Sequence, residues 1–502
     1  EQLGLAEALL AEGIIGSGFR IFLEGEEKAR VGFAHLETPY PCLLILPQSG
    51  TERLLSKYLT ERGAHIDRSV ELTALGQDDT GVNCTLRHGD GREEACRADY
   101  VLGCDGAHSV VRKQVSLGFA GEPLPGNFVL ADVAIDGDFP LDEGRAYVGS
   151  AGFLLVIPIG GGQWRIIARL TNEEYPTTPP VTLALLQQLC SQRGPSNLRP
   201  HDPTWLSMFQ ISSRIVERFR VGRVFVLGDA AHIHSPAGGQ GMNTGMQEAF
   251  NLGWKLAMRL GGQAPDALLD SFDAERRPHA QGVLQNTERA TQLMMSTSSA
   301  ASWLRHAALA VAGKLDLVTE TVVGQISDLK VHYRNGPLSA EENVDLAQWL
   351  QSYVGRSPHP GVQDRIDFAS GPRAGDRAPD AEGLCREPGR SQRLFRWRGE
   401  GLRHYGLVFA GEAPTAQRVG QLRQAVDELN ARHPQLLSTT LIRCGLGPAD
   451  ERTLFDTQRM AHDRYGARYE CLYLVRPDGH IGFRSQPVDV AAVDRYWSKV
   501  YG

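Results

Sequence analysis

One stretch of this sequence constrains the fold more than any other. It reads GDAAHIHSPAGGQGMNTGMQEAFNLGWKLA, runs from Gly228 to Ala257, and follows directly after the apolar segment RVFVL. The apolar segment predicts a buried strand, and the residues from about Asn243 onward predict a helix. A connection between a strand and a helix does not need several glycines around a Pro, a Gln and an Asn. The sequence therefore predicts an α/β sheet whose edge carries a backbone shaped around a ligand.

The chemistry of this stretch points to a flat, electron-accepting ligand. Asp229 comes where the strand ends, and a carboxylate at that position accepts hydrogen bonds from sugar-like hydroxyl groups. The glycines present backbone N–H groups without Cβ atoms, and the following helix directs its positive N-terminal end at the same place. A flavin ring suits these features, because its carbonyl oxygen gains negative charge on reduction. A glycine-rich turn that serves only close packing of helix and strand is the alternative.

Composition and charge narrow the class of protein. The chain has 502 residues, 42% of them hydrophobic and 22% charged, which is typical of a soluble globular protein with several domains. Its net charge of −7 argues against nucleic acid or an anionic membrane as the main partner, and no apolar run is long enough to span a bilayer. The eight cysteines contain no C-x-x-C pair and predict reduced thiols in a cytoplasmic protein. His232 and His234 lack the further ligands that a metal needs, so we expect no metal.

The remaining segments differ in their periodicity. A strand at LLIL precedes a helix for which Ser49 and Glu52 predict a capping box. The turn HGDG predicts a hairpin, and ADYVLGCDGAHSVVRKQV predicts a strand, a turn and a short helix with Ser109 as N-cap. Strand patterns from Phe128 to Leu170 predict an antiparallel sheet, and the pattern from Leu268 to about Tyr333 is mostly helical.

The last part of the chain is predicted to be a separate domain. A stretch rich in Pro, Gly and Arg, from Gly371 to Gly383, predicts a linker. Beyond it the order is strand, helix, three strands and a helix, which is the core order of a thioredoxin-like domain. This part has no C-x-x-C, so we interpret Cys444 and Cys471 as packing thiols without a redox role.

Taken together, these motifs resemble those of the single-component aromatic-ring hydroxylases, the para-hydroxybenzoate and phenol hydroxylase-like flavoprotein monooxygenases. The segments that carry the resemblance are GDAAHIHSPAGGQGMN, VLGCDGAHSVVRK, LLILPQSGTERLL, LLDSFDAERRPHA and GPRAGDRAPDA. Within this family, the sequence most resembles the longer members that carry a C-terminal thioredoxin-like domain, such as pentachlorophenol monooxygenases and polyketide hydroxylases. The resemblance implies a mixed α/β fold: a Rossmann-like FAD-binding domain interrupted by an antiparallel-sheet substrate domain, then a thioredoxin-like domain.

The implied domain boundaries include one departure from the family. We expect the FAD-binding domain over residues 1–125 and, with a helical segment, over 206–345; the substrate domain over 126–205; a linker over 346–383; and the thioredoxin-like domain over 384–502. The family opens with a G-x-G-x-x-G turn that holds the FAD pyrophosphate, and this sequence contains none. Aligned by pattern, Glu1 falls just after that unit. We therefore expect the sequence to be a fragment, or its start to be misplaced, rather than a natural protein without this unit, and we expect it to bind FAD weakly or not at all.

The resemblance also implies roles for particular residues. Asp105 and Gly106 would serve both FAD and the nicotinamide nucleotide, and Asp229 would hold the ribityl chain or a nearby phosphate. The implied cofactor-binding residues are Gln48, Asp105, Gly106, Gly228, Asp229, Pro236, Gly239, Gln240, Gly241, Met242 and Asn243. Pro236 would lie beside the reactive edge of the flavin. Alternate residues among Met208, Phe209 and Ile211 line the substrate pocket or, alternatively, pack in a core.

The implied reaction is hydroxylation of a phenolic or polyketide-like aromatic substrate. NAD(P)H would reduce FAD, O2 would add at the flavin C4a carbon, and the hydroperoxide would transfer one oxygen atom to the ring. A Baeyer-Villiger oxidation, an epoxidation, or a silent flavin-fold binding protein are the alternatives. The expected partners are a small aromatic substrate and O2, without nucleic acid or membrane, in a cytoplasmic protein that forms a homodimer. The sequence does not identify a catalytic base.

Overall fold

The structure is a computed structural model, and it divides into two compact units. It describes residues 3–123, 126–170, 175, 177, 179–235, 239–295, 323–324, 327–343, 360–387, 389–398, 402–448 and 450–502. The first unit comprises residues 1–245 and 280–328, and the second comprises residues 246–279 and 329–502. The domain boundaries given above remain predictions.

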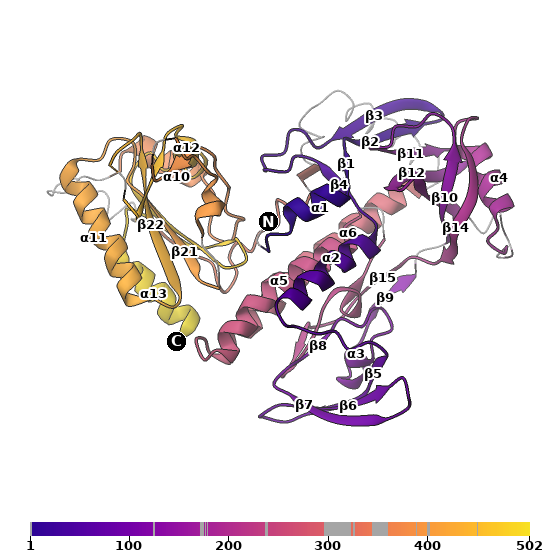
Figure 1. Ribbon diagram of the computed structural model, residues 1–502, viewed down its shortest axis with the longest axis horizontal. Coiled ribbons are helices and arrows are strands. Elements are labelled where there is room, and N and C mark those ends of the chain that lie inside the picture. Colours follow the sequence, from indigo (N-terminus) through magenta and orange to yellow (C-terminus); the bar gives the residue numbers. More distant parts are fainter. Residues whose placement is uncertain are drawn as a thin grey trace. The chain divides into compact units, whose positions relative to one another are not determined.

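A seven-stranded sheet dominates the first unit (Figure 1). Its strands, in spatial order, are β14 (Arg199–Phe209), β10 (Asn127–Asp136), β13 (Gln163–Leu170), β12 (Gly152–Gly160), β11 (Glu143–Gly149), β2 (Gly18–Leu23) and β3 (Glu26–Gly32). All neighbours are antiparallel except β11 and β2. The antiparallel sheet that was predicted between Phe128 and Leu170 is therefore confirmed, and two strands from the start of the chain extend it.

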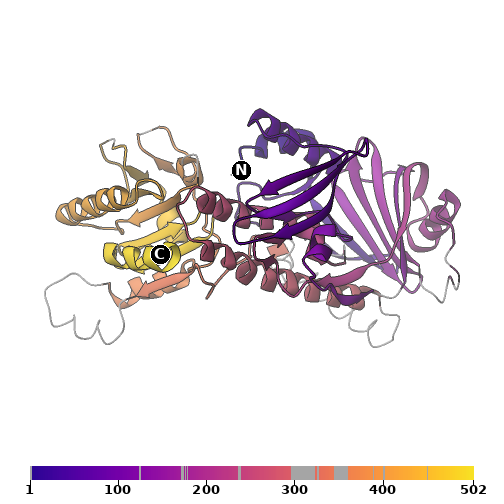
Figure 2. The same cartoon turned by 90° about the horizontal axis from the view of Figure 1, so that it is seen from below.

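The two faces of this sheet are covered differently. Alternate residues of β10, such as Val129, Ala131 and Val133, are fully buried in a core that also contains Leu186 and Leu189 of helix α4 (Leu183–Arg193). Figure 2 shows α4 beside the sheet in a second view. The opposite face carries a smaller apolar cluster around Phe128, in which several members are only partly buried. The period of two along each strand separates these two sets of side chains.

Smaller sheets make up the rest of the first unit. A three-stranded sheet has the order β16 (Arg220–Val221), β17 (Val224–Val226) and β8 (Val101–Gly103), and a second has the order β5 (Val70–Gln77), β6 (Val82–His88) and β7 (Glu93–Ala98). A third contains β18 (His232–Ile233), β15 (Ser212–Ile215) and β9 (Ala120–Pro123), and β1 (Ile14–Gly16) pairs with β4 (Leu43–Ile45). The helices are α1 (Ala6–Glu12), α2 (Gln48–Glu61) and α3 (Val110–Gln114). The hairpin predicted at HGDG is the β6–β7 hairpin.

Two predicted helix caps have different outcomes. Ser109 caps α3 as predicted, because its hydroxyl accepts a hydrogen bond from the Arg112 N–H at 2.9 Å. The capping box of Ser49 and Glu52 is wrong. Helix α2 already begins at Gln48 after Pro47, and no side chain caps it. Ser49 therefore lies inside the helix rather than at its N-cap position, and Glu52 Oε1 accepts a hydrogen bond from the Gln48 side chain at 2.8 Å.

Two long helices belong to both units. Helix α5 (Gly241–Leu260) and helix α6 (Asp270–Met295) are joined by the short 3-10 helix η3 (Asp266–Leu269), and they lie side by side in both views (Figures 1 and 2). The first residues of α5 belong to the first unit, and the segment 246–279 belongs to the second. The predicted helical region from Leu268 is confirmed as far as Met295. Residues 296–322 and 325–326 lie outside the described residues, and residues 327–333, at the end of the predicted region, are not helical.

The second unit is built around another seven-stranded sheet. Its spatial order is β19 (Ala340–Asn343), β25 (Ile481–Gln486), β24 (Cys471–Val475), β21 (His404–Phe409), β22 (Leu437–Cys444), β23 (Thr453–Asp456) and β20 (Leu384–Cys385). Helices α11 (Ala416–Arg432) and α13 (Val490–Tyr501) contribute to the core on one side of the sheet. Helices α10 (Val362–Ser370) and α12 (Met460–Arg464) contribute to the core on the other.

The predicted thioredoxin-like order is present with additions. Strand β23 and helix α12 are inserted between the second strand and the closing hairpin, whose turn lies at Asp478 as predicted. The stretch 371–383, the end of the predicted linker, is packed: Ala374, Ala378 and Ala381 are buried in the core that contains α10 and α12. The backbone N–H of Gly375 also donates to the carbonyl oxygen of Ile481 at 2.7 Å. Small side chains let this irregular segment lie against the sheet.

Candidate functional site

Two of the predicted cofactor loops follow neighbouring parallel strands. Strands β8 and β17 pair in parallel with Gly103 opposite Val226, and the Leu227 N–H donates to the Gly103 carbonyl oxygen at 2.9 Å. The loops that begin after these strands therefore start at the same edge of the sheet. One contains Asp105 and Gly106, and the other contains Gly228 and Asp229. The carboxyl ends of parallel strands are where α/β proteins bind ligands.

Gly228 makes a turn that another residue would not make without strain. Its φ is +55°, in the left-handed region, and it opens the 3-10 helix η1 (Gly228–Ala230). Helix α5 also passes close by, because a Cβ placed on Gly245 would lie only 3.5 Å from the Gly228 Cα atom. The glycines at 228 and 245 thus allow the loop and the helix to approach each other closely.

The turn leaves the Asp229 side chain exposed. Within the described ranges, the Asp229 carboxylate has no hydrogen bond or ion pair with any other residue, whereas the Asp105 carboxylate of the neighbouring loop is engaged. An exposed, unpaired acceptor at the carboxyl end of a buried strand is available to a ligand that carries hydroxyl groups.

Asp105 has a structural task in this conformation. Its Oδ1 accepts the Ser109 hydroxyl at 2.5 Å, and its Oδ2 accepts the N–H groups of Val110 and Val111 at 2.7 and 3.1 Å. The carboxylate therefore caps the start of α3 and holds the loop that contains Gly106. Gly106 has φ +79°. Asp105 thus stabilises the conformation of this loop, a role that the sequence did not predict.

Arg112 connects the two loops. Its side chain is buried, with 5% of the residue exposed, and its guanidinium donates to the Ala230 carbonyl at 3.0 Å and to the Ala107 carbonyl at 2.9 Å. It also stacks over the Phe119 ring at 3.9 Å. Burial lowers the pKa of this guanidinium from its ordinary value, although Asp105 opposes the shift. Sequence reasoning missed this role, because a single Arg on a short helix gives no signal of burial.

The glycine-rich loop continues into α5. Gly239 has φ +62°, and no described atom beyond its chain neighbours lies within 4 Å of the place that a Cβ would take. Gln240 is only 9% exposed, and its amide donates to Asp328 Oδ1 at 2.9 Å. Gly241 is the first residue of α5, and Met242 and Asn243 in its first turn are exposed. The predicted residue Pro236 lies outside the described residues.

The other predicted site residues follow or lie near strands of other sheets, not the sheet that contains β8 and β17. Gln48 is exposed at the start of α2, after β4, which pairs with β1 rather than with β8 or β17. Met208 packs against the core of the seven-stranded sheet that α4 covers, whereas Phe209 and Ile211 belong to the cluster on the opposite face. Phe209 stacks on Phe128 there, with ring centroids 5.6 Å apart. The three candidates for a substrate pocket are thus divided between two faces.

The described part of the chain contains no group of three His, Cys, Asp or Glu side chains arranged to hold a metal ion. The His232 ring stacks between Phe219 and His234, with centroids 5.8 and 6.3 Å away. Nor does any described helix have the length and apolar character needed to cross a membrane.

Comparison with known proteins accounts for this arrangement. Residues 1–287 match the family described as FAD binding domain. A rifampicin monooxygenase of Streptomyces venezuelae is 37% identical over 390 residues, which cover 73% of this chain and 79% of that protein. The chain belongs to this family of FAD-dependent monooxygenases.

Two further comparisons agree with the family. Pentachlorophenol 4-monooxygenase of Sphingobium chlorophenolicum is 31% identical over 393 residues, or 76% of this chain and 66% of that protein. The solved structure of an anhydrotetracycline hydroxylase from Streptomyces rimosus has a TM-score of 0.71 and 26% identity, and the match covers 100% of this chain and 88% of that one. The predicted resemblance to FAD-dependent aromatic hydroxylases and the predicted mixed α/β fold are confirmed.

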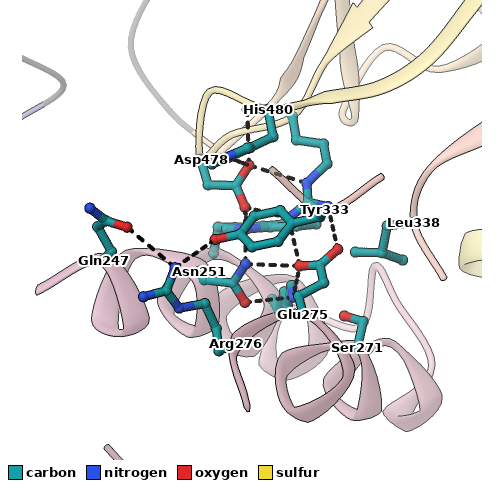
Figure 3. Close-up of polar contacts among 12 residues, drawn as sticks. Gln247, Asn251, Ser271, Glu275, Arg276, Tyr333, Leu338, Asp478 and His480 are labelled. Atoms are coloured by element: carbon teal, nitrogen blue, oxygen red, sulfur yellow. Dashed lines mark hydrogen bonds and ion pairs between the residues drawn. The ribbon is translucent and has the colours of Figure 1, made fainter. Parts of the chain in front are cut away.

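The second unit of this FAD-dependent monooxygenase contains a cluster of buried charges (Figure 3). The Lys255 ammonium donates to Asn251 Oδ1 at 2.7 Å and to Glu275 Oε2 at 2.9 Å. The Arg476 guanidinium binds both oxygens of Glu275, at 2.5 and 2.9 Å, and both oxygens of Asp478, at 3.1 and 2.5 Å. The side chains of Lys255, Glu275 and Arg476 have no solvent exposure. The cluster therefore joins α5, α6 and the β24–β25 turn.

Burial and pairing shift the pKa values of these groups in opposing ways. Burial lowers the pKa of Lys255 to about 8, although Glu275 opposes the shift. Burial acts to raise the pKa of Glu275, but Arg476 and Lys255 outweigh it and lower that pKa to about 2. At neutral pH the cluster holds two cations and two anions, and this balance fits a structural role. Lys255 and Glu275 stand in the motifs NLGWKLA and LLDSFDAERRPHA, so a lysine among apolar helix residues was the available signal.

Proposed function

We propose that this FAD-dependent monooxygenase hydroxylates a phenolic or polyketide-like aromatic compound, with NAD(P)H as the electron donor and O2 as the source of the oxygen atom. The relatives support this substrate class by their names, which specify rifampicin, pentachlorophenol and anhydrotetracycline. The single observation that carries the proposal is the meeting of the Asp105–Gly106 and Gly228–Asp229 loops at the carboxyl ends of two parallel strands.

The residues at this edge fit an FAD molecule. The Asp229 carboxylate is exposed and unpaired within the described ranges, and Gly239 leaves open the space that a Cβ would fill. Bound FAD supplies the redox chemistry that activates O2. In the proposal, Asp229 accepts hydrogen bonds from hydroxyl groups of the ribityl chain. The N-terminal end of α5, with Gly241, Met242 and Asn243, would hold the electron-accepting end of the ring and would favour negative charge there.

Other residues hold these groups in place. Arg112 fixes the distance between the two loops through the carbonyls of Ala107 and Ala230. Asp105 sets the conformation of its loop by capping α3, so in the proposal its effect on FAD is indirect. Gln240 anchors the start of α5 through Asp328.

The proposed substrate surface is the face of the seven-stranded sheet opposite α4. Phe128, Ile167 and Ile211 are buried there, and partly buried apolar side chains surround them, namely Leu130, Leu155 and Phe209. An apolar, partly open surface of this kind suits a flat aromatic molecule. We therefore assign Phe209 and Ile211 to the substrate side and leave Met208 to core packing.

A test separates the assignment of Asp229 from nonspecific effects. Loss of one or two charge-assisted hydrogen bonds, about 1.5–3 kcal/mol each, should raise the Kd for FAD roughly tenfold or more in the Asp229→Ala variant. Asp138, an exposed aspartate elsewhere in the first unit, provides the control, and Asp138→Asn should leave the Kd unchanged. Equal FAD retention by both variants after dialysis would rule out the contact.

The reaction type needs a second measurement. Turnover of a panel of phenolic and polyketide aromatics under 18O2, with NADH or NADPH, should give a product that carries one 18O on a ring carbon. A ring-expanded ester would indicate Baeyer-Villiger oxidation, and an epoxide would indicate epoxidation. A cytoplasmic location and a homodimeric state complete the proposal.

A further inference from the structure

Two cysteines face each other across the β6–β7 hairpin. Cys84 of β6 is the direct register partner of Cys96 of β7. The hairpin closes with a hydrogen bond from the His88 N–H to the Arg92 carbonyl at 2.9 Å. Because hydrogen-bonded pairs alternate along antiparallel strands, Leu86–Glu94 and Cys84–Cys96 occupy further positions of the same type. Cα atoms at such positions are about 5.5 Å apart, which is the commonest separation in disulfides.

The surroundings of the pair suit a reaction that starts from one thiol. Cys84 is buried, with 6% exposure, whereas Cys96 is partly exposed, so a small oxidant reaches Cys96 more easily. Burial raises the pKa of the Cys84 thiol, and contact with the Cys96 thiol raises it further. A buried thiol beside a more accessible one is the arrangement of a resolving cysteine next to an oxidisable cysteine.

We propose that Cys84 and Cys96 form a reversible disulfide when the protein meets a peroxide. Hydrogen peroxide first oxidises the Cys96 thiol to a sulfenic acid and leaves as one water molecule. The Cys84 sulfur then attacks the Cys96 sulfur, the S–S bond forms, and the hydroxyl group leaves with the thiol proton as a second water. Two thiols lose two electrons and two protons in total, and the peroxide O–O bond is reduced.

The position of the pair predicts that the bond is easily reduced. Opposite Cβ atoms in an antiparallel pair are about 4.5–5.5 Å apart, and the wider separation belongs to hydrogen-bonded positions. A disulfide draws Cβ atoms to about 3.8 Å, so closing this bond strains the hairpin. Strained disulfides have more oxidising potentials and are the labile ones. The bond should therefore form under peroxide and open again in a glutathione buffer.

Peptide mapping of the intact protein tests this proposal. Arg68 and Arg87 place tryptic cleavage sites on both sides of Cys84, and Arg92 and Arg97 do so for Cys96. After treatment with hydrogen peroxide and blocking of free thiols, the peptides 69–87 and 93–97 should appear as one linked species, two hydrogens lighter than their sum. Reduction should separate them, and reduced glutathione should do so before digestion.

Two variants make the outcome specific. Cys96→Ser should abolish the linked species and leave Cys84 as a free thiol after the same treatment. Cys104→Ser, which removes an exposed cysteine elsewhere in the first unit, should leave the linked species unchanged. Unlinked peptides from peroxide-treated wild-type protein in which Cys104 has been oxidised would overturn the proposal. A linkage of Cys84 or Cys96 to any other cysteine would do the same.

Discussion

Replacement of Arg476 by Met should destabilise the second unit strongly. Wild-type protein buries two cations and two anions in this cluster, and the variant would bury Lys255 with two carboxylates. Glu275 would keep its bond to Lys255 at 2.9 Å. Asp478 would keep the Trp254 indole at 3.1 Å and the Asn251 amide at 3.5 Å, together with the His480 imidazole at 3.5 Å, which is a cation only when protonated. Breaking a buried ion pair in this way costs about 3–5 kcal/mol.

The loss is large enough to measure by calorimetry. For a unit of this size it corresponds to a fall in Tm of roughly 6–20 °C in the transition of the second unit. The Arg476→Met/Asp478→Asn double variant should recover part of the loss, because it also removes the carboxylate left without a cation. Arg495→Met provides the matched control. Arg495 pairs with Glu342 at the surface and is 58% exposed in its side chain, so this variant should melt like wild type.

The stability deficit of the Arg476→Met variant should also depend on pH. Without Arg476, the two carboxyl groups take up protons more readily in the folded state, so their folded pKa values rise. A raised folded pKa gives stability that is present at low pH and lost as the pH rises. The deficit of Arg476→Met relative to wild type should therefore be smaller at pH 5 than at pH 8. A deficit that is the same at both values, or a Tm within about 2 °C of wild type, would refute the argument from buried charge.

Three further outcomes are expected. The Arg112→Met variant loses two charge-assisted hydrogen bonds, so the first unit should lose about 3 kcal/mol in denaturant unfolding, whereas the exposed neighbour Lys113→Met should lose little. The Gly228→Ala variant places a Cβ at φ +55° and should cost about 1–2 kcal/mol in the same assay. Between pH 4.5 and 2, wild type should lose about 3 kcal/mol of stability from Glu275, because the folded pKa of about 2 lies below the ordinary value of 4.5. In the Glu275→Gln variant, the free energy of unfolding should fall less steeply over that pH range.

Local patterns predicted most of the elements that position the candidate site. The apolar run before Gly228 and the run before Gly103 were each recognised as strands, and their parallel pairing placed Asp105 and Asp229 at one edge. The antiparallel sheet and the closing hairpin at Asp478 followed from alternation and turn residues in the same way. These features depend on residues that are close in sequence.

Features that depend on distant partners were missed. The buried Arg112 donates a hydrogen bond to the carbonyl of Ala230, which is 118 residues away in the sequence. The residues around Arg112 give no indication of this partner. Lys255 and Glu275 lie within recognisable motifs, but their partner Arg476 is 201 residues beyond Glu275. The predicted capping box at Ser49 is wrong for a local reason, because helix α2 begins one residue earlier, at Gln48, after Pro47.

The buried charge cluster also sets an order of events during synthesis. Glu275 leaves the ribosome 201 residues before Arg476, which corresponds to roughly 10–40 s of translation at about 5–20 residues per second. Throughout this delay, Lys255 is the one cluster cation available to Glu275, and the Glu275 Oε1 atom that Arg476 binds in the folded protein must be solvated by water. We therefore expect α5 and α6 to bury the Glu275 carboxylate fully only after Arg476 has been made. On this reasoning, the core of the second unit closes after the β24–β25 turn has been made.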